Sequence, residues 1–328
     1  MSPLKLGVLL IISSVQIHGS ILTSQELQQR QSLNRSSSPE WSSFSDLVEW
    51  SAIKAPLMVD ATTRRKQPGG DGIGCGVQAP NFQPTIGDSK FICGATLLRV
   101  QDDSESSDIV LTAAHCVARR QMFADPQPVS VSTLSVVAGR HRHNVPGQYN
   151  QQRQVSEIRM HPKFVMTQTL INNDIALVKL ASPIKFNEAI RPLCLPQQGA
   201  PIPVSQTCVL TGWGRNNSNN HFESADALQQ LVLPVHSAAT CYKSWSAMYR
   251  EKSMICAGSL KAESGGCLGD SGSMLACKQD GRWLQHGVTS FGDGDRCTVE
   301  NKPGVFARVS GYVDWIKETM QKLTSLKK

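Results

Sequence analysis

The sequence lacks several features that would place it in common protein classes. Its ten cysteines include no Cys-x-x-Cys pair, the spacing typical of zinc sites, so zinc ligation is not expected. We also expect no other metal and no cofactor. No apolar run reaches the roughly 20 residues that a membrane-spanning helix needs. Aromatic residues make up only 6% of the chain, and its basic residues are scattered. Because nucleic-acid binding favours basic residues on one face with stacking aromatics, we expect no nucleic-acid partner.

The N-terminus has the organisation of a secretory signal peptide. Lys5 precedes a short apolar stretch over residues 6–12, and small polar residues follow up to Ser20. We therefore predict a signal peptide over residues 1–20 and a secreted, extracellular protein. The even cysteine count suits an oxidising compartment, where five disulfides would use all ten cysteines. The sequence by itself permits roughly a thousand pairings.

Residues 21–74 differ in composition from the rest of the chain. They are rich in Ser and Gln and show little apolar periodicity. Such a segment cannot bury enough apolar surface to order itself, so we predict a disordered pro-segment or linker. Asn34 lies in a glycosylation sequon within this segment, and Asn216 lies in a second sequon within a polar loop. In a secreted chain both asparagines are predicted glycosylation sites.

From Cys75 onward, short apolar runs alternate with clusters of Gly, Pro and Asn. These runs have the length and composition of strands, and they predict an antiparallel all-β sandwich or barrel over residues 75–328. The predicted strands cover residues 91–98, 109–113, 134–138, 175–180, 208–211, 228–235, 274–277, 288–291 and 305–309. A helix is predicted at the C-terminus, where Ser310 can cap an apolar stripe formed by Val313, Ile316, Met320 and Leu323.

Three polar residues form a candidate nucleophilic site. Ser271 lies in Gly269-Asp-Ser-Gly272, where glycines permit a tight loop with outward-facing N–H groups. A serine attacks a carbonyl only when a base takes its proton and nearby donors hold the oxyanion. His115, which follows an apolar run and precedes a cysteine, is the candidate base. Asp174, at the start of another apolar run, is the candidate carboxylate that orients the imidazole.

Together these residues resemble the trypsin/chymotrypsin family of serine endopeptidases. The resemblance runs from about Cys93 to the C-terminus and implies two packed six-stranded antiparallel β-barrels, with the site in the cleft between them and a helix at the C-terminus. Besides the serine motif, the matching motifs are Thr112-Ala-Ala-His-Cys116, Asp174-Ile-Ala-Leu177, Arg191-Pro-Leu-Cys194, Gly212-Trp-Gly214, Met254-Ile-Cys-Ala-Gly258 and Pro303-Gly-Val-Phe306.

The resemblance implies a role for each site residue. His115 would act as general base and then as general acid, Asp174 would orient it, and Ser271 would form the acyl-enzyme. The N–H groups of Gly269 and Ser271 would form the oxyanion hole. The implied disulfides are Cys75–Cys194, Cys93–Cys116, Cys208–Cys277, Cys241–Cys256 and Cys267–Cys297. The family's calcium loop corresponds to residues 140–153, which are basic here, so we expect no calcium there.

The resemblance also implies a primary substrate pocket with Gly265 at its base and Gly292 and Gly304 on its walls. Glycines at the base and on both walls predict an open, uncharged pocket and cleavage after Phe, Tyr, Leu or Met. As an alternative, Asp293 and Asp295 on the adjoining loop would attract a basic residue. The segment 290–292 would pair with the substrate backbone as an added strand. The predicted substrate-binding residues are Gly265, Gly266, Leu268, Ser290, Phe291, Gly292 and Gly304.

The chain departs from the family at its activation segment. Members are usually cut to expose an Ile-Val-Gly-Gly end, whose ammonium pairs with the acid before the nucleophile, here Asp270. This sequence has no Ile-Val-Gly-Gly, and its nearest counterpart follows the basic cluster that ends at Lys66. The stretch between Cys75 and Cys93 is too short for both a cut site and the first barrel strand, and Pro84 is unsuited to a paired strand. A defective first barrel is therefore one expectation.

Two functions fit these observations. The first is a secreted, monomeric serine endopeptidase made as a zymogen, with protein or peptide substrates, an activating protease and protein protease inhibitors as partners. The second is an activation-defective, serine-protease-like protein that acts as a binding or cofactor module. The three site residues favour the first function, and the missing Ile-Val-Gly-Gly end favours the second.

Overall fold

The fold is taken from a computed structural model of the chain. The structure describes residues 16–17, 20–21, 55–56, 75, 85–87, 92–101, 103–119, 125–142, 145, 147–201, 204–215 and 224–325. One body extends from Trp50 to Lys328. In the segment ahead of it, β1 (Gln16–Ile17) pairs with β2 (Ser20–Ile21). The two predicted glycosylation sites, Asn34 and Asn216, and nearly all of the predicted signal peptide and pro-segment lie outside the described residues.

The first barrel is a sheet of order β5-β4-β10-β11-β14-β7-β6. The segments at its two ends, β5 and β6, are separated only by Ala95 in the chain. They are therefore two halves of one strand, and the sheet closes into a six-stranded barrel. The bounds are β4 (Thr85–Gly87), β5 (Ile92–Gly94), β6 (Thr96–Leu97), β7 (Ser106–Thr112), β10 (Ser135–Ala138), β11 (Gln151–Met160) and β14 (Ala176–Lys185).

The expectation of a defective first barrel is wrong, because β4 supplies the first strand. Thr85 and Ile86 are buried, and β4 pairs antiparallel with both β5 and β10. The paired residues of β4 are Thr85, Ile86 and Gly87, none of which is a proline, so each has a backbone N–H for the ladder.

The second barrel has the order β17-β20-β19-β18-β15-β16, with the short β3 (Ala55–Pro56) added at the outer edge of β16. A bridge between Val235, just after β16, and Ala257, at the end of β17, joins the two edges of the sheet and closes this barrel as well. The bounds are β15 (Thr207–Gly212), β16 (Gln229–Pro234), β17 (Met254–Ala257), β18 (Met274–Gln279), β19 (Arg282–Phe291) and β20 (Gly304–Arg308).

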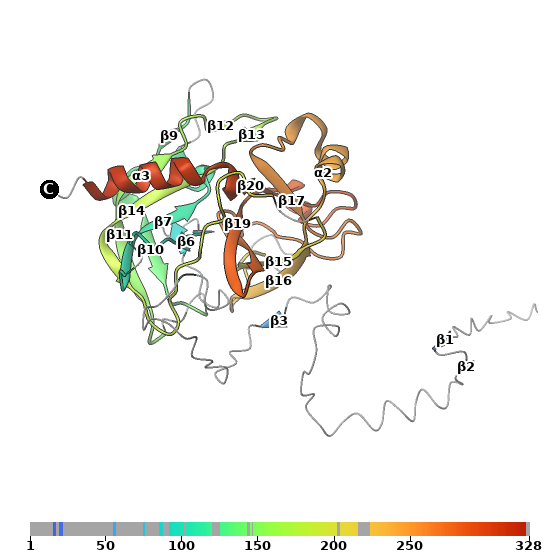
Figure 1. The fold of residues 1–328 in the computed structure, drawn as a ribbon, viewed down its shortest axis with the longest axis horizontal. Coiled ribbons are helices and arrows are strands. Elements are labelled where there is room, and N and C mark those ends of the chain that lie inside the picture. Colours follow the sequence, from blue (N-terminus) through green and yellow to red (C-terminus); the bar gives the residue numbers. More distant parts are fainter. Residues whose placement is uncertain are drawn as a thin grey trace, which may run out of the picture. The chain divides into compact units, whose positions relative to one another are not determined.

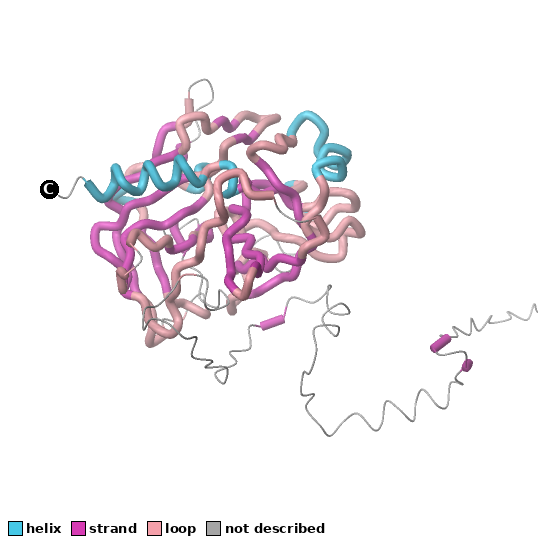
Figure 2. Tube along the Cα trace, viewed as in Figure 1, coloured by secondary structure: helices cyan, strands magenta, loops and turns pink. Residues whose placement is uncertain are grey.

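The two barrels lie side by side, with the first in green and the second in orange in Figure 1. Strands and loops make up most of the body, and helices contribute only a small part of it (Figure 2). The remaining strands form two small hairpins, β8 (Ala118–Arg119) with β9 (Gln127–Pro128) and β12 (Val165–Met166) with β13 (Ile171–Asn172). Short 3-10 turns are η2 (Ala114–Cys116), η3 (Val131–Thr133), η4 (Ser246–Met248), η5 (Gly294–Arg296) and η6 (Val309–Gly311).

Two α-helices complete the body, α2 (Ala238–Trp245) and α3 (Val313–Ser325). Helix α3 lies across the first barrel (Figure 1). The predicted apolar stripe, Val313, Ile316, Met320 and Leu323, is buried in the core of that barrel. Among the described residues, no helix has both the length and the apolarity to cross a membrane.

Five disulfides tie the body together, and they join the same pairs that the family resemblance implies. Cys93–Cys116 lies in the first barrel, next to His115. Cys75–Cys194 links a residue ahead of β4 to the connection between the barrels. The other three, Cys208–Cys277, Cys241–Cys256 and Cys267–Cys297, staple the second barrel and its loops. Each bridge typically contributes about 2–4 kcal/mol to stability.

Candidate active site

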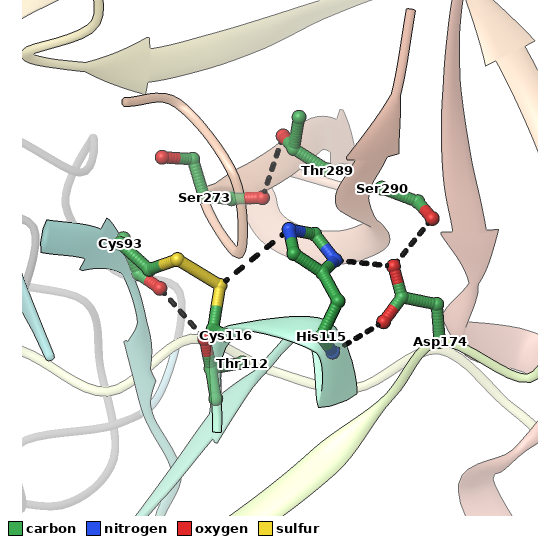
Figure 3. The surroundings of a disulfide bond; sticks show 9 residues. Cys93, Thr112, His115, Cys116, Asp174, Ser273, Thr289 and Ser290 are labelled. Carbon is green, nitrogen blue, oxygen red and sulfur yellow. Dashed lines mark hydrogen bonds and ion pairs between the residues drawn. A yellow bond between two sulfur atoms is a disulfide. The ribbon is translucent and has the colours of Figure 1, made fainter. Parts of the chain in front are cut away.

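His115 lies in η2, directly after the buried strand β7. Its side chain is 13% exposed, so the ring is shielded on most sides but still reaches the surface. Figure 3 shows the ring between the Cys93–Cys116 disulfide and the Asp174 carboxylate, with Nε2 3.8 Å from Cys116 Sγ. Cys93, His115 and Cys116 bring three potential metal ligands close together. Both sulfurs are oxidised in the disulfide, so this cluster has no thiolate to offer a metal.

The Asp174 carboxylate is buried and holds His115 at two points. Its Oδ2 lies 2.7 Å from His115 Nδ1, and its Oδ1 accepts a hydrogen bond of 2.8 Å from the His115 backbone N–H. Ser290 Oγ donates to Oδ2 at 2.5 Å (Figure 3). Burial acts to raise the pKa of Asp174, but the attraction of His115 and the hydrogen bonds from His115 and Ser290 outweigh it, so the pKa lies below its ordinary value.

This arrangement fixes the tautomer of the histidine. An ionised carboxylate can only accept hydrogen bonds, so Nδ1 of His115 must carry the proton that bonds to Asp174. Nε2 is then left with a lone pair and can take a proton from a nearby hydroxyl. The pair has the chemistry of a general base with its orienting acid.

The loop that carries Ser271 belongs to the second barrel but packs against the first. The Ser271 carbonyl accepts a hydrogen bond of 2.8 Å from Gly94 N–H. Gly272 has φ +75°, and a Cβ there would lie 2.4 Å from both Gly94 O and Thr112 Oγ1. Only glycine fits this close approach. The loop therefore lies against the end of β7, beside the turn that carries His115.

The peptide unit between Leu268 and Gly269 is fixed by a neighbouring segment. Arg215 N–H donates to Leu268 O at 2.9 Å. In a trans peptide the C=O and the following N–H point in opposite directions, so the Gly269 N–H points away from Arg215. Gly269 has φ +96°, which an L side chain rarely adopts. The Gly269 N–H is therefore not used by Arg215, and an oxyanion hole formed by the N–H groups of Gly269 and Ser271 stays a prediction.

Asp270 is buried and hydrogen-bonded to backbone. Its Oδ1 accepts from Gly214 N–H and its Oδ2 from Cys267 N–H, both at 2.8 Å. A Cβ on Gly212 would lie 2.0 Å from Oδ1, and one on Gly214 would lie 2.3 Å from the carboxyl carbon. The Gly-Trp-Gly motif therefore makes room for this carboxylate, a function that the sequence did not reveal.

The predicted pocket residues differ in how closely other atoms surround them. At Gly265 a Cβ would lie 3.2 Å from Cys297 O and 3.4 Å from Thr298 Cγ2, so these two residues face the predicted pocket base. At Gly292 a Cβ would meet nothing within 4 Å, so this wall is open. Leu268 is 49% exposed, directly before Gly269 in the loop that carries Ser271. At Gly266 a Cβ would touch the Leu210 side chain. Asp293 forms an ion pair of 3.0 Å with Arg296.

A cluster that the sequence reasoning missed supports the other side of the predicted pocket. Trp245, in α2, packs edge-on against the Phe291 ring with centroids 5.2 Å apart. Its Nε1 donates to Pro303 O at 2.9 Å, which fixes the residue before Gly304. The Lys302 ammonium lies 4.6 Å from the centre of the indole ring. These contacts join segments distant in the sequence, so no local motif indicates them.

Comparisons with known proteins agree with this geometry. The Trypsin family model matches residues 78–316, which include both barrels and the start of α3. Chymotrypsin-C of Rattus norvegicus is 36% identical over 235 residues, which cover 71% of this chain and 79% of the relative. Chymotrypsin-like elastase family member 1 of Canis lupus familiaris is 37% identical over 230 residues, which cover 70% of this chain and 81% of the relative. The chain therefore belongs to the trypsin family of serine proteases.

Proposed function

We propose that the protein is a secreted serine endopeptidase that hydrolyses peptide bonds through His115, Asp174 and Ser271. The observation that carries this proposal is the hydrogen bond between His115 Nδ1 and the buried Asp174 carboxylate, which leaves Nε2 of the histidine as a base. The packing of the Ser271 loop against the His115 turn supports it, as does membership of a serine protease family. The signal-like N-terminus supports secretion.

The proposed reaction has two halves. Nε2 of His115 takes the proton from Ser271 Oγ while Oγ attacks the substrate carbonyl, and the ionised Asp174 stabilises the imidazolium that forms. The N–H groups of Gly269 and Ser271 hold the oxyanion, each worth about 3–4 kcal/mol in the transition state. His115 then protonates the leaving amine, and a water molecule releases the acyl group from Ser271 by the same steps in reverse.

For the substrate we propose a large apolar residue on the acyl side of the cut bond. Glycine at 265, at the base, gives the pocket no charge, and the open wall at Gly292 leaves room for a bulky side chain. A basic residue is the alternative, because Asp293 lies on the adjoining loop. The ion pair of Asp293 with Arg296 argues against it, since much of that negative charge is already compensated.

The competing function is a binding or cofactor module with an unused triad, favoured by the missing Ile-Val-Gly-Gly end. We propose that a zymogen form is cut by an activating protease, and that Asp270 then takes the new ammonium as partner. The two backbone hydrogen bonds to Asp270 support an ordered loop around Ser271. An ordered loop favours the enzyme over the module.

A covalent probe separates the two functions. The secreted protein is treated with a fluorophosphonate before and after limited trypsin digestion, beside Ser271→Ala and His115→Ala. The enzyme predicts labelling of Ser271 that both substitutions abolish. If the folded protein stays unlabelled before and after digestion, the module is the better description. Labelling only after digestion identifies a zymogen, and N-terminal sequencing then gives the cut site.

A further inference from the structure

Asp174 lies at the apex of a tight turn. Ile175 N–H donates to the Asn173 carbonyl at 2.9 Å, so Asp174 is the central residue of a γ-turn. Asn173 itself has φ +52°, a left-handed conformation that asparagine tolerates better than most residues. The direction of the Asp174 side chain therefore depends on what holds its two neighbours in place.

The turn that follows β11 holds both of these neighbours. His161 N–H donates to Ile175 O at 3.0 Å, on one side of Asp174. On the other side, Asn173 Nδ2 donates to Lys163 O at 2.6 Å. His161 Nδ1 accepts from Lys163 N–H at 3.2 Å, which keeps the turn itself compact.

Tyr312, directly before α3, completes the support. Its hydroxyl donates to Asn173 Oδ1 at 3.1 Å, with Ser253 O as a second acceptor at 3.4 Å. Burial raises the pKa of Tyr312 well above its ordinary value, so the hydroxyl keeps its proton and remains a donor. The Tyr312 ring also packs edge-on against the His161 ring, with centroids 5.1 Å apart. The C-terminal segment thus contacts both the asparagine and the turn that grips it.

We propose that Asn173 and Tyr312 are positioning residues for the catalytic triad. They act through the backbone of Asp174, and they keep its carboxylate in line with Nδ1 of His115 without touching the substrate. Ser290 and the His115 backbone N–H fix the carboxylate oxygens, whereas Asn173 and Tyr312 fix the chain from which the carboxylate projects. This proposal rests on the proposed function, because it assumes that Asp174 orients the base.

The size of the expected effect follows from geometry. A misplacement of about 1 Å in a catalytic group can lower the rate about 100-fold. Tyr312→Phe removes the hydroxyl that bonds to Asn173 and Ser253 and keeps the ring packing. Asn173→Gly removes both side-chain hydrogen bonds but keeps access to positive φ, and Asn173→Ala also disfavours that φ. The loss of kcat should therefore increase in that order.

The test compares these variants with two matched controls in the full, activated protein. Tyr249→Phe also removes a buried hydroxyl that donates to a carbonyl, that of Met254 at 3.1 Å, but one in the second barrel. Asp280→Ala places alanine at φ +48° in the hairpin between β18 and β19. The readouts are kcat and KM on a peptide p-nitroanilide with Phe before the cut bond, and the ¹H NMR resonance of the proton between His115 and Asp174 in the unreacted protein.

We expect kcat to fall about 10-fold in Tyr312→Phe and about 100-fold in Asn173→Ala, with KM within about twofold and both controls near wild type. The bridging-proton resonance should shift or broaden in the same order. Equal kcat losses in variants and controls with an unchanged resonance, or the lack of that resonance in wild type, would overturn the positioning role. A different outcome would separate the two proposals. If the bridging-proton resonance responds to Tyr312→Phe but the fluorophosphonate labels no serine, the positioning role stands and the proposed enzymatic function is refuted.

Discussion

The Asp270 carboxylate packs directly against the backbone of Gly212 and Gly214. Each is close enough to it that a methyl group would overlap the carboxyl atoms, and Gly214 also donates a hydrogen bond. Asp270 in turn fixes the loop between Cys267 and Ser273, where its N–H bonds to Cys267 O and its carbonyl accepts from Ser273 N–H. The shape of the proposed oxyanion hole is therefore set by residues outside the predicted substrate-binding set.

Gly214→Ala tests this dependence. The new methyl group would displace the Asp270 carboxylate and with it the N–H of Gly269, and loss of one oxyanion donor lowers kcat about 100–1,000-fold. The rate of fluorophosphonate labelling and kcat on a peptide p-nitroanilide measure the effect. Gly147→Ala is the control, because a Cβ there meets only one atom, at 3.9 Å. Full activity in folded Gly214→Ala would contradict this account.

Residue types in the local sequence were sufficient to propose His115, Asp174 and Ser271, and the structure brings the first two together. The function of Gly214 was not predictable in this way, because the residue that it supports lies 56 positions later in the chain. The same holds for Trp245 and Pro303, which are 58 positions apart. Such contacts depend on how the loops of the second barrel are arranged in space, and no local pattern in a single sequence indicates that arrangement.

At the scale of elements, α3 shows how an apolar stripe determines packing. Ile316 is fully buried in the first barrel, together with the other stripe residues. Ile316→Ala should destabilise the protein by about 2–5 kcal/mol, since it removes buried methyl groups and leaves a cavity. Urea unfolding, followed by tryptophan fluorescence, measures this. Lys317→Ala, on the exposed face of the same helix, should change stability by less than about 0.5 kcal/mol. Similar losses in both variants would argue against the packing.

Elements with an apolar pattern were predictable, and elements without one were missed. The ten-residue strand β11 begins Gln-Gln-Arg-Gln and buries only Val155 fully, so it lacks strand-like composition. It is a strand because it pairs with β10 and β14 on its two edges. Helix α2 was missed although Ser237 caps it by accepting a hydrogen bond from Thr240 N–H, a signal that the sequence did contain. The closure of each sheet into a barrel could be predicted only from the family resemblance.

At the scale of the whole molecule, the candidate site lies where the barrels meet. Gly94 of the first barrel holds Ser271, and His141 O of the first barrel accepts from Trp213 Nε1 at 3.1 Å. Helix α3 follows the second barrel in the chain but packs on the first, and the preceding Tyr312 reaches the turn at Asp174. Stability of the assembled body is therefore a condition for activity, and pH should act on it through groups buried during folding.

Two kinds of buried group respond to acid over different ranges of pH. The ring of His286 is fully buried, and neither of its nitrogens has a hydrogen-bond partner among the described residues. Burial, with a smaller effect of Arg308, lowers its pKa from 6.5 to about 4. The unfolded chain therefore binds more protons than the folded chain between these values, and stability falls as pH drops from about 6.5 to about 4. The pKa of Asp174 is lowered too, so its contribution is lost only below its ordinary value of 3.8.

His286→Leu should remove the part of the stability loss between about pH 6.5 and about pH 4 that His286 causes. From about pH 7.5 to about pH 4.5, this one histidine accounts for a loss of about 2–3 kcal/mol in the free energy of unfolding. Burial, with a smaller effect of Lys163, also lowers the pKa of His161 to about 4, so an acid loss over the same range should remain in the variant. Because His161 is only half-buried, solvent screening makes this remaining loss smaller than that of His286. Urea unfolding at both pH values, in a Ser271→Ala background that prevents self-digestion, gives the difference directly. Leucine at this position cannot bind a proton. An equal fall in the free energy of unfolding in the two proteins would therefore show that His286 does not cause the loss of stability in acid.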